Sequence, residues 1–345
     1  MTDQDKLARL RAKYADASAS AVDNEEFKRV ADLLFTGDSR KFPFSGIPTL
    51  LDAPARPDAA ETGAFDDLEI ALIGVPMDLG VTNRPGARFG PRAIRAIERV
   101  GPYNHALRAV PLAERRVADI GDVPLSTRYS LDRSIADIEE FYHRLMDAGV
   151  RPVSAGGDHS VTYPILKALG RDRPVAMVHI DAHCDTGGAF EGAKFHHGGP
   201  FRHAVLDGVL DPERTIQIGI RGSSEFVWEF SYDSGMTVIH TETFAEMGVA
   251  AVIEKARTVV GDGPVYVSLD VDGIDPAFAP GTGTPEVGGL SPREVQALLR
   301  GLDGLDIIGG DVVEVAPEYD ANHNTAHLGA QMLFEILCLV ARAPF

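Results

Sequence analysis

Cysteine, net positive charge and the glycine motifs of nucleotide-binding proteins are scarce or missing in this chain of 345 residues. Its two cysteines, Cys184 and Cys338, are too few for a disulfide framework. Lys and Arg number 33 against 51 Asp and Glu, and the resulting charge of −18 argues against nucleic acid, whose phosphates need a basic surface. No GxGxxG follows a strand-like run, and P-loop and GxSxG motifs are absent, which argues against the usual dinucleotide, phosphate-loop and nucleophile-elbow sites.

Long apolar runs are missing as well. No run approaches the length of a membrane span, and the polar N-terminus lacks the apolar core of a signal peptide. We therefore expect no membrane partner and a cytoplasmic location. The length and the 44% hydrophobic content suit one large α/β domain with a full core.

The first 65 residues differ in character from the rest. We expect an N-terminal extension over residues 1–65 and one main domain over residues 66–345. Within the extension, Asp3 to Tyr14 is charged and helix-prone, and residues 15–20 are typical of a linker. Residues 42–51 and the Pro-rich residues 53–58 predict an arm along the surface. Three interpretations of the arm stay open: a lid, a contact between subunits, or a mobile terminus.

From residue 68 onward, short apolar runs alternate with stretches of helical character. The strand-like runs are Glu69–Val75, Arg116–Ile120, Arg151–Ala155, Val175–Asp181, Thr215–Ile220, Thr237–His240, Val265–Asp270 and Leu305–Val313. The helix-like stretches include Pro91–Arg99, Leu131–Ala148, Val161–Leu169, Phe244–Val260, Pro292–Leu302 and His327–Ala341. This alternation predicts a three-layer α/β/α fold with a mostly parallel central sheet. Functional side chains in such sheets lie beyond the carboxyl ends of the strands.

Metal-ligand side chains stand at those strand ends. Residues 178–185 form an apolar run that finishes with Asp181, His183 and Asp185, and side chains two apart in an extended backbone point the same way. Asp270 and Asp272 repeat this pattern after another strand-like run, and His159 adds a second imidazole after a glycine pair. Each motif alone also fits a structural histidine or a turn-capping Asp. Three together predict a binuclear metal site.

The charges of these ligands favour two cations over one. Four buried carboxylates repel one another, and two divalent cations balance them where one does not. Mixed Asp and His ligation favours Mn, Co, Ni or Fe over Mg or Ca. The absence of thiolate ligands argues against a structural zinc site.

With these residues in view, the chain resembles the ureohydrolases, the family of arginase, agmatinase and the guanidino-acid hydrolases. The motifs that carry the resemblance are Gly156–Ser160, Asp181–Asp185, Ser268–Pro276 and Gly281–Pro285, within about residues 68–342, and Phe195–Arg202 is closest to the agmatinase-like branch. The resemblance implies an arginase-like fold, two Mn ions, and a homo-oligomer that is a trimer or hexamer. Ni or Co would suit the same ligands.

The resemblance also implies a role for each ligand position. It implies that His159 and Asp185 bind one metal and that His183 and Asp272 bind the other. Asp181 and Asp270 would bridge the two metals. Asp185 would also touch the hydroxide between the metals.

Two further positions match catalytic roles of the family. His197 matches the histidine that moves protons, and Glu314 matches the carboxylate that holds the guanidinium of the substrate. From position alone, a structural loop histidine and an ordinary salt bridge would be the commoner interpretations. The neighbouring His196 has no role in the family.

The expected reaction is hydrolysis of a small cationic guanidino compound to urea and an amine. The loop of residues 186–196 departs from the Ser/Asn-rich stretch of arginases, which disfavours free arginine and leaves agmatine or a guanidino acid such as 4-guanidinobutyrate. Lys194 and Arg202 would suit a carboxylate tail, and Glu191 an amine tail. The small residues of the loop also admit guanidine itself or a biguanide.

Two interpretations from other classes also stay open. One is a non-catalytic subunit of a hetero-oligomeric hydrolase, which loss of metal ligands would favour. The other is a binuclear hydrolase of phosphate esters, which would need a basic cluster at the site.

Overall fold

The computed structural model describes residues 3–98, 100–222 and 224–345, and contacts divide the chain into Met1–Gly46 and Ile47–Phe345. The smaller unit holds the helices α1 (Asp3–Tyr14) and α2 (Glu25–Leu34) and the short strands β1 (Phe35–Thr36) and β2 (Ser39–Arg40). α1 confirms the helix expected from its charged sequence. The expected boundary of the extension at residue 65 stays a prediction.

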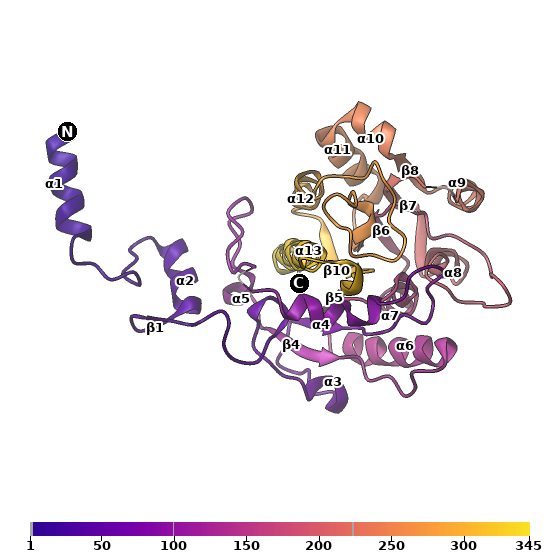
Figure 1. Cartoon of the computed structure of the whole chain (residues 1–345), viewed down its shortest axis with the longest axis horizontal. Helices are drawn as coiled ribbons and strands as arrows, with labels where there is room; N and C mark the ends of the chain where they lie inside the picture. The colour runs from indigo at the N-terminus through magenta and orange to yellow at the C-terminus, as the bar shows by residue number, and fades with distance from the viewer. Residues whose placement is uncertain (1–2, 99, 223) are drawn as a thin grey trace. The chain divides into compact units, whose positions relative to one another are not determined.

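An eight-stranded parallel sheet forms the centre of the larger unit, in the order β4-β3-β5-β10-β9-β6-β7-β8 (Figure 1). Its strands are β3 (Ile70–Gly74), β4 (Val117–Asp122), β5 (Arg151–Ala155), β6 (Val175–Ile180), β7 (Leu210–Ile220), β8 (Thr237–His240), β9 (Pro264–Asp270) and β10 (Asp306–Val313). All eight strand-like runs of the sequence are confirmed.

Helices cover both faces of this sheet. Alternate residues of the strands pack into two cores on opposite faces of the sheet. In β3, Ile70 and Leu72 pack into one core, and Ala71 and Ile73 pack into the other. The first core includes α4 (Gly90–Arg95), α11 (Val249–Val260), α12 (Pro292–Gly301) and α13 (Asn324–Arg342). The second includes α6 (Leu131–Asp147), α7 (Thr162–Leu169) and α8 (Pro200–Leu206). The three-layer α/β/α fold is therefore confirmed.

The helices differ from expectation mainly at their ends. The stretch Phe244–Val260 is two helices, α10 (Thr241–Met247) and α11, because Gly248 between them has a φ of 76° that ends the first. α4 stops at Arg95, short of the expected end at Arg99, which lies outside the described residues. The remaining short helices are α3 (Ala59–Thr62), α5 (Pro111–Glu114) and α9 (Trp228–Ser234).

One helix corrects the expectation about apolar length. Over the described residues, α13 is long and apolar enough to cross a membrane, but 78% of its apolar window is buried in the protein. It packs on β10 and β5 as a core helix of the α/β unit.

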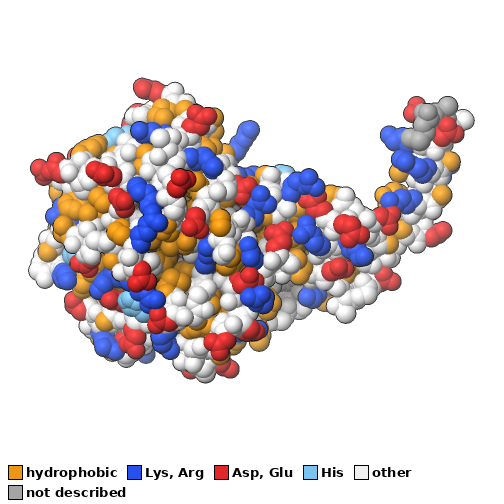
Figure 2. All heavy atoms as spheres, turned by 180° about the vertical axis from the view of Figure 1, so that it is seen from behind, with side chains coloured by type: hydrophobic (Ala, Val, Ile, Leu, Met, Phe, Trp, Pro, Cys, Tyr) orange, Lys and Arg blue, Asp and Glu red, His pale blue; other side chains and the backbone are white. Residues whose placement is uncertain are grey.

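Charged side chains are mixed on the visible surface. In Figure 2, Lys and Arg side chains alternate with Asp and Glu over the face shown, and no continuous basic patch covers it.

Candidate metal centre and active site

All six predicted metal ligands lie at or just beyond the carboxyl edge of the sheet: Asp270 is the last residue of β9, and the others follow β5, β6 and β9. His159 opens a short 3-10 turn after β5, where Asp158 accepts a hydrogen bond from the Ser160 N–H. The chain reaches this turn by passing close to Met77: a Cβ on Gly157 would lie 1.7 Å from the Met77 carbonyl oxygen. Only glycine fits that position, so the glycine pair sets the place of His159.

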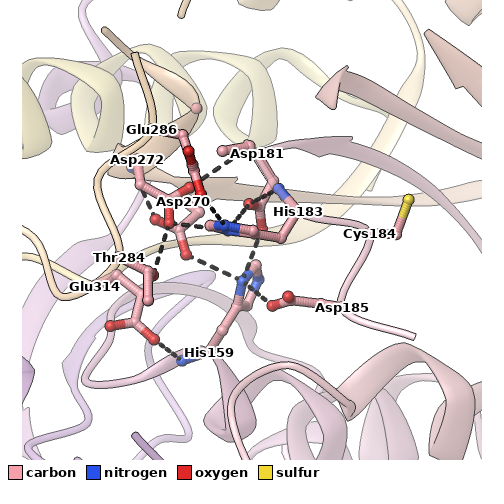
Figure 3. A network of polar contacts seen from close by, with 12 residues as sticks. His159, Asp181, His183, Cys184, Asp185, Asp270, Asp272, Thr284, Glu286 and Glu314 are labelled. Atoms are coloured by element: carbon pink, nitrogen blue, oxygen red, sulfur yellow. Dashed lines mark hydrogen bonds and ion pairs between the residues drawn. The ribbon is translucent and has the colours of Figure 1, made fainter. Parts of the chain in front are cut away.

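Three carboxylates surround the imidazole of His159. Its Nδ1 lies 3.1 Å from an oxygen of Asp181, 2.9 Å from one of Asp185 and 3.3 Å from one of Asp270 (Figure 3). Its Nε2 lies 2.9 Å from the Ser268 hydroxyl, which donates its own proton to Asp311. Since the Ser268 proton is used, the hydroxyl oxygen accepts from Nε2–H, and Nδ1 of a neutral ring keeps a free lone pair. That lone pair suits a metal ion.

A second group forms around His183. Its Nδ1 lies 3.2 Å from Asp272 Oδ2 and 3.4 Å from Asp181 Oδ1. Asp181 therefore faces both histidines, with Oδ2 toward His159 and Oδ1 toward His183. The ligand atoms of Asp181, His183 and Asp272 lie within 4.8 Å of one another, which is close enough to hold one ion.

The charges of this buried cluster are unbalanced without cations. Burial, together with Asp272 and Asp181, raises the pKa of Asp270 well above its usual range, and burial beside Asp181 raises that of Asp272 to about 6. Burial alone would lower the pKa of His159, but the carboxylates around it, Asp181 first, hold it well above its usual range. Divalent cations would replace these protons and relieve the repulsion, so the ligand set fits a metal centre.

Glu314 follows β10 and completes the cluster from another side. Its Oε1 accepts the His159 backbone N–H at 2.9 Å and contacts His197 Nδ1 at 2.8 Å, while its Oε2 is buried with no hydrogen-bond partner among the described residues. Glu314 and Asp185 both adopt left-handed backbones, with φ of 65° and 53°. Such conformations are costly for residues other than glycine and cluster at functional sites.

His197 bridges Glu314 and Thr82. Its Nε2 lies 2.7 Å from the Thr82 hydroxyl and 3.2 Å from the Thr82 backbone N–H, a contact that opposes a proton on Nε2. Burial disfavours the charged ring, but the charge and hydrogen bond of Glu314 and the charge of Asp185 raise the pKa of His197 to about 9.

A cavity of about 300 Å³ opens from the cluster to the surface. Its inner end is formed by the metal-ligand candidates His183, Asp185, Asp270 and Asp272, together with His197. Thr82 and Thr284 adjoin this end through their contacts with His197 and Asp272. The outer wall is Gly187, Gly188, Ala189, Phe190, His196, Gly198, Ser224, Phe226 and Val227. Within the described part of the chain, this outer wall carries no Lys, Arg, Asp or Glu.

Several polar residues near the site have structural partners instead. Arg202 donates to the Thr186 carbonyl at 2.8 Å, and Lys194 and Glu191 are exposed and outside the cavity lining. The Arg221 side chain donates to backbone carbonyls, including that of Asp272 at 2.7 Å. Cys184 is buried, and its side chain points away from the carboxylates in Figure 3.

Sequence reasoning missed two kinds of site residue. Thr82, Ser224 and Phe226 reach the cavity from loops and carry no motif. His179 is different, because it lies in β6 two residues before Asp181, and the period of a strand places it on the same side. It forms a second possible ion-binding group with His159 and Asp181.

Known proteins resemble this chain over most of its length. The profile of the arginase family matches residues 68–339. Guanidinopropionase of Pseudomonas aeruginosa is 50% identical over 89% of this chain and 96% of its own, and mitochondrial agmatinase of Gallus gallus is 46% identical over 97% of each. Among solved structures, proclavaminate amidino hydrolase of Streptomyces clavuligerus aligns with a TM-score of 0.81 at 38% identity, covering 88% of this chain and all of its own.

Proposed function

We propose that this chain, which belongs to the arginase family, hydrolyses a guanidino compound to urea and an amine. The family profile spans most of the larger unit, and the relatives named above include hydrolases of guanidino compounds. The observation that carries the proposal is the position of Glu314: a buried carboxylate oxygen that has no hydrogen-bond partner among the described residues lies beside a cluster of His and Asp ligands.

The six clustered side chains would hold two divalent cations. His159 and Asp185 would ligate one, His183 and Asp272 the other, and Asp181 and Asp270 would lie between them, an assignment supported by the contacts of Asp181 with both histidines. Such a pair supplies Lewis acidity and makes water a strong nucleophile near neutral pH. We propose Mn²⁺ as the native ion; Ni²⁺ and Co²⁺ suit the same nitrogen and oxygen ligands.

The remaining residues would bind the substrate and move protons. The open oxygen of Glu314, Oε2, would accept hydrogen bonds from the N–H groups of a planar guanidinium while Oε1 keeps its contact with His197, a charge-assisted arrangement. Asp185 would orient the attacking water. His197, held between Glu314 and the Thr82 hydroxyl, would carry a proton to the leaving amine.

The substrate we propose is agmatine or a guanidino acid such as 4-guanidinobutyrate. Relatives named for both classes support this, including a guanidinobutyrase of Pseudomonas aeruginosa at 43% identity. The uncharged outer wall of the cavity favours a second candidate, guanidine itself or a substituted guanidine or biguanide, since no described side chain there would neutralise a charged tail.

We also propose that the chain works as a homo-oligomer, a trimer or hexamer, in the cytoplasm, without nucleic-acid or membrane partners. The mixed surface charges in Figure 2 and the net charge of −18 support the absence of a nucleic-acid partner. The relative from Gallus gallus is named as mitochondrial, so location needs its own test by fractionation. The intact ligand set disfavours a non-catalytic subunit, and the neutral cavity wall disfavours phosphate esters.

The test is urea release from a panel of guanidino compounds by protein reloaded with Mn²⁺ or Ni²⁺. The panel holds arginine, agmatine, guanidinobutyrate, guanidinopropionate, guanidinoacetate, guanidine and a biguanide. Urea from one or more of these supports the proposal and ranks the substrates. If no compound yields urea although two ions are bound per chain, the proposed reaction is wrong.

A further inference from the structure

His179 is a buried histidine that none of the proposed roles uses. It lies in β6 two residues before Asp181, and its side chain is completely buried. Its ring packs edge-on against Phe201, with centroids 4.5 Å apart, and against His159 at 5.3 Å. Its Nε2 lies 2.7 Å from Asp181 Oδ2. In this packed position the ring points a nitrogen at the carboxylate that lies between the two ligand groups.

The partner of the other ring nitrogen decides which nitrogen carries the proton. Gln217 in β7 stands opposite His179 in the parallel register. Its amide nitrogen lies 2.6 Å from the Cys184 carbonyl, an oxygen that can only accept, so the nitrogen of the amide must face it. The same nitrogen lies 3.1 Å from His179 Nδ1. A donor at Nδ1 makes Nδ1 the acceptor of a neutral ring, and the proton then sits on Nε2 and is donated to Asp181.

Asp181 is therefore held by a donor on each of its oxygens. Oδ2 accepts from His179 Nε2–H, and Oδ1 accepts from the His183 backbone N–H at 2.6 Å. Each carboxylate oxygen has room for a second partner. The remaining lone pair of Oδ2 faces His159, and that of Oδ1 faces His183. The two donors thus fix the plane in which Asp181 can reach both ligand groups.

We propose that His179 is a positioning residue, which presets Asp181 to bridge two metal ions through a Cys184–Gln217–His179–Asp181 hydrogen-bond chain, and that it is not a third histidine ligand. A ligand role would need a free lone pair on Nε2, and the Gln217 contact removes it. The inference rests on the proposed two-metal centre.

The experiment titrates metal-free protein with Mn²⁺ by calorimetry and records the electron paramagnetic resonance of the loaded protein. The parent should bind two ions that are magnetically coupled. His179→Leu should bind the second ion at least about 10-fold more weakly and lose coupling, because removal of groups that orient metal ligands typically costs 10- to 100-fold in affinity. His179→Gln, which places a donor near the same point, should recover most of both.

The control is Met177→Leu, a volume-conserving change on the same strand and in the same core as Phe201, which should leave both readouts unchanged. If His179→Leu does not fold, Gln217→Leu decides, with a loss of about threefold or more in Mn²⁺ affinity expected. Parent-like affinity in the folded His179→Leu protein, or in Gln217→Leu, overturns the inference. So does a glutamine variant no better than leucine. A parent that binds fewer than two ions instead contradicts the proposed metal centre itself.

Discussion

The two ends of the cavity are built in opposite ways. Behind the inner end, His159, Asp181 and Glu314 are buried against the residues that line it, and each is held by several named partners. At the outer end, Phe226 is 78% exposed, and Phe190 is half-exposed on a glycine-rich loop. The inner end has little freedom to change without leaving a buried charge unpaired, whereas the outer end can change at small cost. The inner end therefore sets the reaction, and the outer end sets which guanidino compound reaches it.

The largest expected effect comes from the inner end. Asp270→Asn should lower urea release on the order of 1,000-fold and reduce the bound metal below two ions per chain, since the bridging charge is lost. Metal analysis and a urea assay on the same preparation measure both. Asp172→Ala, an exposed Asp before the opposite end of β6, is the matched control and should keep both values. Full activity of Asp270→Asn would show that the inner end of the cavity does not set the reaction.

His197→Asn should lower kcat about 100-fold at neutral pH, because general acid–base groups contribute at least that much. Metal content should stay at two ions, which separates this residue from the ligands. The control is His143→Asn, which changes a histidine on α6 that does not line the cavity. A parent-like kcat for His197→Asn would remove it from proton transfer.

Glu314→Gln should lower kcat/KM roughly 10- to 100-fold, the usual range for losing one hydrogen bond to a charged group. Most of the change should appear in KM, because the open oxygen would bind the substrate. Nuclear magnetic resonance of the metal-free protein should also show the pKa of His197 falling from about 9. An unchanged KM together with an unchanged His197 pKa would contradict the role of Glu314.

The pH dependence of stability should follow the His197–Glu314 pair. Because the pKa of His197 is raised from 6.5 to about 9 in the folded chain, the pair stabilises the metal-free protein fully below pH 6.5 and loses this effect as pH rises through about 9. The difference in unfolding free energy between parent and His197→Asn should therefore shrink between pH 7 and 10. Chemical denaturation at several pH values measures it, and a constant difference would refute it.

The smallest effect belongs to the outer end. Phe226→Ala should change KM only a few-fold and shift the ranking of substrates, with metal content and kcat for the best substrate almost unchanged. Phe278→Ala, exposed but outside the cavity lining, is the control. A loss of activity as large as that of Asp270→Asn would show that the two ends are not separable.

The same contrast explains how much the sequence could predict. The strands and the ligand positions follow from short-range rules, since apolar runs define β6 and β9, and period-two spacing puts Asp181 and His183 on one side. The family resemblance inferred from those motifs is confirmed by the family match. The outer wall depends on loops whose shape is set by tertiary packing, and no motif marks Ser224 or Phe226. Of the charged residues that we matched to substrate tails, Arg202 donates to a backbone carbonyl, and Lys194 and Glu191 lie outside the cavity lining.

The most direct test is to strip the protein of metal and follow urea release as Mn²⁺ is added back, with the best guanidino substrate present. We predict that activity is negligible without metal and reaches its plateau at two ions per chain. Full activity of the metal-free protein, or a plateau of activity at a single ion per chain, would contradict a two-metal reaction at the cluster.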